Sequence, residues 1–458
     1  MSSNALSPTT VPAGAPTAEE RRRVLGASFI GTAIEWYDFF LYGSAAALIF
    51  GPQFFPSDDP LAGTLAAFAT FAVGFIARPV GGVVMGHFGD RVGRKHMLLL
   101  SMLLMGGATV GIGLLPNHAT VGVLAPILLV TLRFVQGLGV GGEWGGAVLM
   151  AVEYSPANRR SLYGSFPQMG LPAGIILSNI VFIIVTSTMA PEAFQSWGWR
   201  VPFLLSGLLI VVALWLRFRV EESPTFAAAQ KEDAIEASPL GTMVRQHAGK
   251  VALAGLASTA PPAIGYIYSV YMLSYGTTVL ELSRPLMLVL IIVGAVLHLV
   301  TVLIGALASD RLGQKPVFTA GAVLIMLWSF PFFWLIDTAN PLLIVLSFGV
   351  ILLGQSLMAG PQAAMIAGLF PSTVRYSGTS TAYQIGSILG GGFAPLIATA
   401  LYAQFGSSLP ISGYILLLGL LSLGAIVFLK VTPHRAGEPA DVTGTPALAV
   451  APAEVTHH

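Results

Sequence analysis

The sequence predicts an all-α membrane protein with twelve transmembrane helices, arranged as two six-helix pseudo-repeats. Three observations lead to this prediction: a very apolar composition, twelve long apolar segments, and a polar motif that occurs once in each half. Hydrophobic residues make up 55% of the 458-residue chain and charged residues only 9%, whereas a soluble domain carries about 25% charged residues. Too few charges remain to solvate a globular surface of this size, so most of the surface must face lipid.

The twelve predicted spans follow from length and from the residues that interrupt them. A helix needs about 20 mainly apolar residues to cross the hydrocarbon core of a bilayer. The breaks carry Pro, Gly or charged residues, as in the run 55–60. In chain order the predicted spans are residues 24–50, 61–85, 97–116, 121–153, 161–188, 199–218, 251–279, 286–308, 316–336, 342–369, 377–404 and 410–430.

Lys and Arg orient these spans, because cytoplasmic loops carry an excess of both. One set of loops holds most of the basic residues, whereas the opposite set holds only Arg200 and Arg284. Both termini are therefore predicted to be cytoplasmic. The predicted organisation is a disordered tail at 1–23, a six-helix bundle at 24–218, a cytoplasmic loop at 219–250, a second six-helix bundle at 251–430 and a disordered tail at 431–458.

The repeated motif reads Asp-Arg-x-Gly-x-Lys and begins at Asp90 and again at Asp310, 220 residues later. Gln168 and Gln384 form a second pair at nearly the same offset, 216 residues apart. Matches at nearly one offset in corresponding spans indicate an internal repeat. Two homologous bundles around a central site are the arrangement that alternating-access transport requires.

Ionisable residues inside a bilayer are costly and usually functional. Here the charged ones lie in the first half, and His298 is the only conspicuously titratable group in the second-half spans. The charged residues are Glu35 and Asp38 in the first span, Arg78 in the second, and Arg133 and Glu143 in the fourth. At about 1.5 Å per residue, Glu35 and Arg133 each lie roughly 18 Å from the nearer end of their spans. Glu35, Asp38 and Arg133 should therefore converge near the midplane, while Arg78 and Glu143 lie nearer the cytoplasm and could pair there.

Two interpretations of the central charges remain open. In the structural one, Arg133 and a carboxylate neutralise each other and fix two helices. In the other, an anionic substrate engages Arg133, and the carboxylate that loses its partner can take a proton. The second interpretation makes Asp38 and Glu35 the proton-coupling residues and Arg133 a substrate or relay ligand. It fails if Asp38→Asn retains full proton-driven uptake.

A stripe of tyrosines in the seventh span supplies candidate substrate contacts. Tyr268, Tyr271 and Tyr275 follow i, i+3, i+7 spacing and should share one helix face. Gln168 and Gln384 are further polar candidates. An interfacial aromatic belt and helix-to-helix hydrogen bonds are the alternative roles.

The repeated motif predicts a gate as well as a topology anchor. Glycine permits the tight chain reversal, and the charged residues could form a network that closes one conformation and opens in the other. Arg78 and Glu143 are assigned to the same network. The predicted gating residues of the two motif copies are Asp90, Arg91, Gly93, Arg94, Lys95, Asp310, Arg311, Gly313 and Lys315.

Other functional classes lack a sequence signature. No metal-ligand cluster, nucleophile motif or nucleotide-binding loop favours an enzyme, and the chain has no cysteine for disulfides or thiolate metal ligands. No metal or cofactor is therefore predicted. A net charge of +1 argues against a nucleic-acid partner. A channel is less favoured than a carrier, because it needs no gate network on each half.

The motifs together resemble the major facilitator superfamily. The paired loop motif, the twelve spans and the central loop look like that superfamily's fold, and Arg133-x-x-Gln136-Gly137-x-Gly139 looks like its fourth-span motif. In the family this arginine is associated with proton transfer, which adds weight to Arg133. The second loop copy departs from the pattern, since a glutamine replaces a basic residue at 314, and it could be the weaker gate element.

Three narrower segments, 35–39, 77–82 and 141–146, resemble the metabolite:proton symporter family. That family includes permeases for shikimate, 2-oxoglutarate, citrate and proline/betaine. The resemblance implies proton-coupled uptake of a small organic acid across a bacterial inner membrane, with a proline- or betaine-type zwitterion as the alternative substrate. A monomer suffices, because the predicted site lies between the two halves of one chain.

Overall fold

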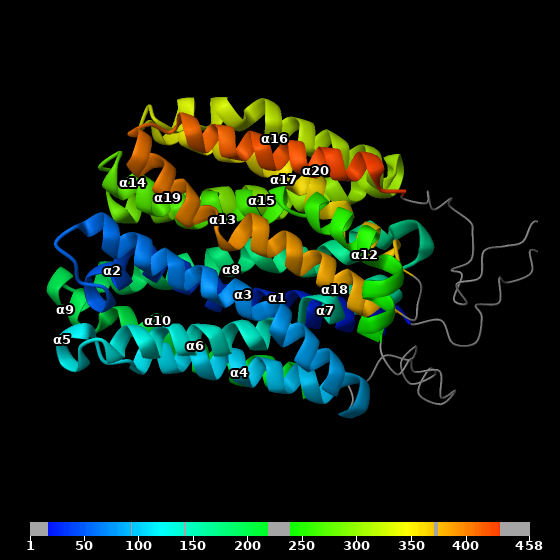
Figure 1. Cartoon of the computed structure of the whole chain (residues 1–458), viewed down its shortest axis with the longest axis horizontal. Helices are drawn as coiled ribbons and strands as arrows, with labels where there is room; N and C mark the ends of the chain where they lie inside the picture. The colour runs from blue at the N-terminus through cyan, green and yellow to red at the C-terminus, as the bar shows by residue number, and fades with distance from the viewer. Residues whose placement is uncertain (1–16, 93, 142, 219–238, 371–373, 431–458) are drawn as a thin grey trace, which may run out of the picture.

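The computed structural model describes residues 17–92, 94–141, 143–218, 239–370 and 374–430, and their regular structure is entirely helical. Figure 1 shows the helices running nearly parallel, with the first half of the chain on one side and the second half on the other. The predictions for 1–16, 219–238 and 431–458, and for Gly93, lie outside the described residues.

The first bundle holds the predicted spans one to six. Its helical segments are α1 (Ala18–Ala45), η1 (Ala46–Phe50), α2 (Gly51–Phe54), α3 (Pro60–Val92), α4 (Arg94–Leu114), α5 (His118–Val121), α6 (Leu124–Val140), α7 (Glu143–Glu153), η2 (Ala157–Arg159), α8 (Arg160–Thr188), α9 (Pro191–Ser196), η3 (Gly198–Arg200) and α10 (Val201–Phe218).

The second bundle holds spans seven to twelve. Its segments are α12 (Pro239–Ala257), α13 (Ala260–Tyr266), η4 (Ile267–Tyr271), α14 (Met272–Thr278), α15 (Arg284–Leu312), α16 (Gln314–Ile336), α17 (Pro341–Ala367), α18 (Arg375–Gly386), η6 (Ser387–Gly392), α19 (Ala394–Phe405) and α20 (Leu409–Phe428).

Ten helices within the described residues are long and apolar enough to cross a membrane. The two remaining predicted spans correspond to α1, which carries charged residues, and to α4, whose apolar part is Leu99–Leu114. Large apolar side chains such as Leu327 and Leu342, 71% and 81% exposed, cover the outside of the bundles. An exposed apolar surface of this kind belongs in lipid, so the chain is a multi-pass membrane protein.

Two predicted boundaries need correction. Helix α1 begins at Ala18 and not at residue 24, because Thr17 and Glu20 form a capping box at its N-terminus. Residues 239–250, predicted to belong to the central loop, are the first part of α12. The fourth predicted span, 121–153, is matched by one candidate membrane span over Leu124–Leu149.

Two ends of the molecule are used below to describe position. The motif end holds Asp310, the first residue of α1 and the last residue of α20; the pocket end holds the first residue of α3 and the last residue of α14 (Figure 1). Between the halves, α8 packs along α15 and α17, and α3 packs against α18, η6 and α19.

Glycine permits a close approach of α1 and α8 within the first bundle. A Cβ at Gly174 on α8 would lie 2.6 Å from the backbone nitrogen of Tyr37 on α1, closer than real side chains approach a backbone. Small residues at such crossings let two helices pack backbone to backbone. This crossing fixes the depth of Asp38, the next residue of α1.

Candidate transport site

Asp38 is fully buried and receives two side-chain hydrogen bonds. Ser206 Oγ on α10 donates to Asp38 Oδ1 at 2.6 Å, and Thr109 Oγ1 on α4 donates to Oδ2 at 3.1 Å. The Thr109 hydroxyl also lies 2.9 Å from the carbonyl oxygen of Met105, so its single proton can point to either acceptor. Hydrogen bonds of this kind favour the charged form of a carboxylate.

Asp38 and Arg133 are linked through two side chains and not by a direct ion pair between these two described residues. Arg133 Nη1 donates to Gln136 Oε1 within α6, because residues three apart share a helix face. Gln136 Nε2 then donates to Thr109 Oγ1 at 2.9 Å, and Thr109 completes the chain to Asp38. Gln136 and Thr109 therefore form a hydrogen-bond relay between the arginine and the carboxylate.

The guanidinium groups of Arg78 and Arg133 lie against the ring of Phe39. Their central carbons are 4.1 Å and 4.0 Å from its centroid, and Arg133 is also 4.0 Å from the centroid of Tyr42. Aromatic faces stabilise a desolvated cation by about 2 kcal/mol, but they leave its N–H groups unbonded. Nε and Nη2 of both arginines are buried and have no hydrogen-bond partner in the described part of the chain.

Glu35 and Glu143 are also buried, 3% and 1% exposed, and so complete the set of intramembrane charges that the sequence predicted for the first half. Glu35 lies within electrostatic reach of the Tyr266 hydroxyl, as do Arg78 and Arg133. All five charged residues are thus inside the first bundle, and Glu35, Arg78 and Arg133 lie near Tyr266 of the second.

Tyr266 is the tyrosine that faces the charged cluster, although the sequence pattern favoured its neighbours. Its ring packs edge to face on Phe71 and Phe75, with centroid distances of 5.4 Å and 5.2 Å. Tyr268 turns instead into the second bundle, where its hydroxyl donates to the Ile291 carbonyl. Tyr266 lies in the same predicted span as these tyrosines but outside their i, i+3, i+7 spacing, so the spacing did not single it out.

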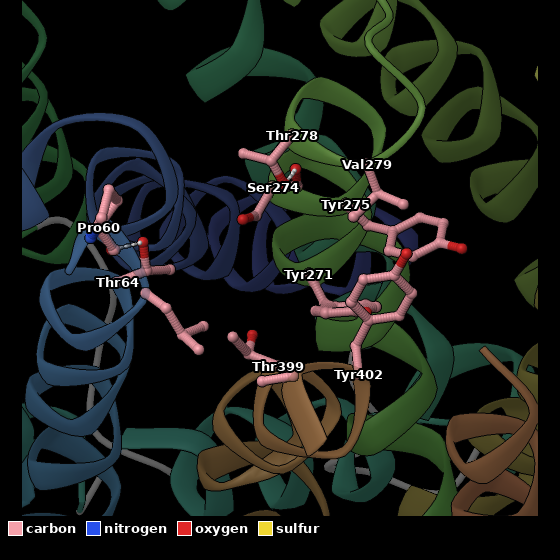
Figure 2. Close-up of a pocket in the computed structure, with 11 residues that line it drawn as sticks. Pro60, Thr64, Tyr271, Ser274, Tyr275, Thr278, Val279, Thr399 and Tyr402 are labelled. Atoms are coloured by element: carbon pink, nitrogen blue, oxygen red, sulfur yellow. Dashed lines mark hydrogen bonds between the residues drawn. The ribbon is translucent and has the colours of Figure 1, made fainter. Parts of the chain in front are cut away.

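Tyr271 and Tyr275 line a cavity of about 340 Å³ at the pocket end, between α3 and the helices α14 and α19. Figure 2 shows Pro60 and Thr64 on one side of this cavity, the rings of Tyr275 and Tyr402 on the other, and Thr399 between them. The walls therefore come from both halves of the chain.

Of the two tyrosines, Tyr275 is held by a carboxylate. Tyr275 donates from its hydroxyl to Asp337 Oδ1 at 2.6 Å, and Ser408 donates to Asp337 Oδ2 at 2.6 Å. These bonds tie the end of α14 to the ends of α16 and α20. They keep α14 on the second bundle, on the far side of the cavity from α3.

The motif end is closed by contacts between the halves, and Asp310 makes two of them. Its carboxylate accepts hydrogen bonds from the backbone N–H groups of Ser161 and Leu162, at 2.9 Å and 3.0 Å. These groups belong to the first turn of α8, where backbone N–H groups lack intrahelical partners and a negative charge is favoured. Ser161 Oγ and Ser309 Oγ add a 3.0 Å hydrogen bond.

The rest of the second motif copy stabilises its own bundle. Gly313 has φ +95°, a conformation that favours glycine. Lys315 Nζ donates to the carbonyls of Val427 and Leu429, both at 3.0 Å, and so caps the end of α20. Arg311 is exposed.

The first motif copy is described only in its backbone. Asp90 and Arg91 lie in the last turn of α3, and Arg94 and Lys95 in the first turn of α4. The positions of their side chains, and of Gly93, lie outside what the structure describes.

Gln168 and Gln384 also bridge the halves near the motif end. Gln168 Nε2 donates to the Ala359 carbonyl at 3.5 Å, and Gln384 Nε2 donates to the Gly141 carbonyl at 3.2 Å. Gln168 Oε1 also accepts from Trp144 Nε1 at 3.3 Å within the first bundle. Trp144 in turn stacks on Tyr383 of the second bundle, with centroids 3.5 Å apart. Among the described residues, contacts between the halves thus lie toward the motif end, and the cavity lies at the pocket end.

No group of three or more His, Cys, Asp or Glu residues that could hold a metal ion is found within the described residues. The chemistry available at the site is therefore that of buried arginines, carboxylates, amides and hydroxyls.

Comparison with known proteins agrees with this architecture. Residues 24–253 match the family described as "Sugar (and other) transporter", and residues 296–455 match "Major Facilitator Superfamily". A solved structure of a proton:xylose symporter bound to 6-bromo-6-deoxy-D-glucose superposes with a TM-score of 0.73 at 18% identity, covering 91% of this chain and 97% of that one.

Three curated relatives extend the comparison. An inner membrane metabolite transport protein of Escherichia coli (strain K12) is 42% identical, covering 91% of this chain and 95% of that protein. The shikimate transporter of the same strain is 40% identical with the same coverage, and its proline/betaine transporter is 32% identical over 90% of this chain and 84% of that protein. The chain therefore belongs to the sugar and metabolite transporters of the major facilitator superfamily, and it is a transporter and not an enzyme.

Proposed function

We propose that this protein imports a small organic acid together with a proton by alternating access. The observation that carries the proposal is the pair of buried arginines with unbonded guanidinium N–H groups, one of them linked by hydrogen bonds to the buried Asp38. Buried polar groups are nearly always hydrogen-bonded. Unbonded cationic donors at the contact between two bundles therefore favour an anionic ligand.

Arg133 and Arg78 would hold the carboxylate of the substrate. A guanidinium presents donors in a planar fork that matches a carboxylate, and charge-assisted bonds of this type are about twice as strong as neutral ones. Both side chains are already desolvated, 0% and 2% exposed. Most of the desolvation cost that remains on binding is therefore that of the substrate. The two guanidinium groups would compensate the charge of the bound carboxylate.

The relay supplies a physical route for proton coupling. A carboxylate that draws Arg133 Nη1 away from Gln136 frees the Gln136 amide, and Thr109 then loses the partner that orients its hydroxyl. Since Thr109 is one of the two side-chain donors to Asp38, occupation of the arginine changes the balance between charged and neutral Asp38. Substrate and proton binding are then thermodynamically linked. Glu35 lies beside the same cluster and is the second candidate proton carrier.

Alternating access would use the two ends of the molecule. The contacts of Asp310 with α8 would close the motif end, and the cavity lined by Tyr271 and Tyr275 would give access from the pocket end. Arg91, Arg94, Lys95 and Asp90 of the first motif copy, together with Arg78 and Glu143, are proposed to complete the gate at the motif end.

The motif end is proposed to be cytoplasmic in a bacterial inner membrane, which places both chain termini in the cytoplasm. Basic residues on the described loops and helix ends concentrate there, as expected for cytoplasmic loops. They include Arg21, Arg22, Arg23, Arg159, Arg160, Arg245, Lys250, Arg311, Lys315, Arg375 and Lys430, against Arg200 and Arg284 at the pocket end. The site lies within one chain, so the monomer is the proposed functional unit.

Uptake into proteoliposomes with an imposed pH gradient tests the proposal. Labelled organic acids should accumulate when the outside is acidic, and accumulation should disappear with a protonophore. Arg133→Gln should abolish saturable uptake, whereas the exposed Arg245→Gln, which removes the same charge outside the site, should not. Saturable acid uptake that is indifferent to the proton gradient would refute symport.

The zwitterion alternative has one favourable observation. The rings of Tyr271, Tyr275 and Tyr402 gather around the cavity (Figure 2), and aromatic faces bind quaternary ammonium groups. Glycine betaine belongs in the same uptake panel, and its accumulation in preference to every acid would favour this alternative.

A further inference from the structure

The second bundle presents buried polar atoms that no described residue satisfies. Some of them, such as the Tyr271 hydroxyl and the ring nitrogens of His298, lie on other helices, and four lie on the tyrosine and glutamine side chains of α13, α17 and α18. An unbonded buried polar group costs about 1–3 kcal/mol, so those that adjoin a transport site point to a ligand. The four atoms are Tyr266 Oη, Gln355 Oε1, Gln362 Nε2 and Gln384 Oε1.

Three of these residues adjoin the arginine cluster or the contact between the halves. The Tyr266 hydroxyl lies within electrostatic reach of Arg78 and Arg133. Gln355 lies against the backbone just before Tyr266, since a Cβ on Gly265 would be 3.1 Å from its Nε2. Gln384 reaches across to the first bundle through its bond to the Gly141 carbonyl.

The chemistry of Gln384 is fixed by that bond. A carbonyl oxygen only accepts, so the Gln384 atom facing Gly141 is the amide nitrogen, and the unbonded atom is the amide oxygen. That oxygen can be satisfied only by an O–H or N–H donor. A quaternary ammonium group has none, and a bare hydrocarbon ring has none.

The second bundle also lacks compensating charge at this depth. No Asp, Glu, Lys or Arg occurs at 251–280, 285–309, 338–374 or 376–429. The part of the substrate that faces it must therefore be polar and uncharged, while the arginines of the first bundle take the charged part.

We propose, on the basis of the function proposed above, that the substrate is a hydroxylated carboxylic acid that spans the two bundles. Its carboxylate binds Arg133 and Arg78, and its hydroxyl groups bind Gln384, Gln355 and Tyr266. Hydroxyl groups suit this surface because each can donate to an amide oxygen and accept from a phenol. A site built to bond a hydroxyl discriminates strongly against the analogue that lacks it.

The test is competition for uptake of labelled shikimate, a trihydroxylated cyclohexene carboxylate, into proteoliposomes of the full-length protein. Unlabelled shikimate, cyclohex-1-ene-1-carboxylate without the hydroxyls, and glycine betaine are the competitors. We expect the deoxy acid to compete at least about tenfold more weakly than shikimate, the effect of roughly one lost hydrogen bond. Gln384→Leu and Tyr266→Phe should weaken shikimate about tenfold each while leaving the deoxy acid unchanged.

Gln246→Leu, on the exposed surface of α12, is the matched control and should behave as the wild type. Tyr266→Phe keeps the ring and its packing, so it tests the hydroxyl even if Gln384→Leu does not fold. Equal competition by both acids, with uptake still dependent on Arg133 and the proton gradient, overturns this inference and leaves the proposed function standing. Competition by betaine alone, or no uptake of any acid, overturns both.

Discussion

Thr109→Val is the most direct test of the link between Asp38 and Arg133. Valine has nearly the shape of threonine, so the packing of α4 is kept and only the hydroxyl is removed. Asp38 Oδ2 then loses its donor and Gln136 Nε2 loses its acceptor. Ser206 remains as the side-chain donor to Asp38.

The magnitude follows from the geometry. A hydrogen bond to a charged group contributes about 1.5–3 kcal/mol. The bond from Thr109 to Asp38 is 3.1 Å long and competes with the Met105 carbonyl, so its contribution should lie at the lower end of that energy range. A loss of about 1.4 kcal/mol changes the proton-binding equilibrium about tenfold, or about one pH unit. Because the charged carboxylate is the form that loses its donor, the midpoint of the uptake profile should move toward higher pH.

The assay is initial uptake across a series of external pH values, with counterflow at equal pH as the second readout. Thr109→Ser keeps the hydroxyl and should restore the wild-type profile, and Thr131→Val on the exposed face of α6 controls for loss of a threonine. A Thr109→Val profile that superimposes on the wild type would refute the relay. Equal loss of counterflow and of driven uptake would indicate a structural role only.

Three further predictions concern the frame around the site. Asp310→Ala removes the acceptor of two α8 N–H groups and should loosen the contact between the halves. A cysteine introduced at the buried Ala359 would be the only cysteine of the chain, and it should be alkylated faster in this variant. Unchanged labelling would contradict the proposed gate. Tyr275→Phe removes a 2.6 Å bond to a carboxylate and should cost about 1.5–3 kcal/mol, seen as a lower Tm in detergent. Gly174→Ala forces a Cβ to 2.6 Å from a backbone nitrogen and should destabilise by about 1–3 kcal/mol, whereas Gly26→Ala, with open space around it, should not lower the Tm; equal effects would contradict the close crossing.

The sequence was sufficient for the frame and for the buried charges. Charged residues within an apolar span are costly and therefore rare. Asp38, Arg78 and Arg133 could be singled out from composition and depth alone. The contact of Arg133 with Gln136 also follows from their spacing of three residues. Thr109 could not be found in this way, because a neutral hydroxyl on another helix leaves no signal in a hydropathy pattern.

The tyrosine row shows why periodicity alone misplaces a side chain. The spacing of Tyr268, Tyr271 and Tyr275 predicts one shared face only if the helix keeps 3.6 residues per turn. Residues 267–271 instead form a π-helical segment, which adds a residue to the turn and rotates what precedes it. Tyr266 is thereby turned toward the arginines and Tyr268 away from them, and no local sequence rule gives that rotation.

The uneven distribution of charge between the bundles has an electrical consequence. A membrane potential does about 2.3 kcal/mol of work per elementary charge per 100 mV, and only on charge that moves through the field. Glu35, Asp38, Arg78, Arg133 and Glu143 lie in the first bundle, while the longest stretches of the second carry no Asp, Glu, Lys or Arg. Any voltage sensitivity of the transport cycle is therefore set by the first bundle and by the net charge it holds when the substrate and the proposed proton are bound. Movement of the uncharged stretches of the second bundle through the same field requires almost no electrical work.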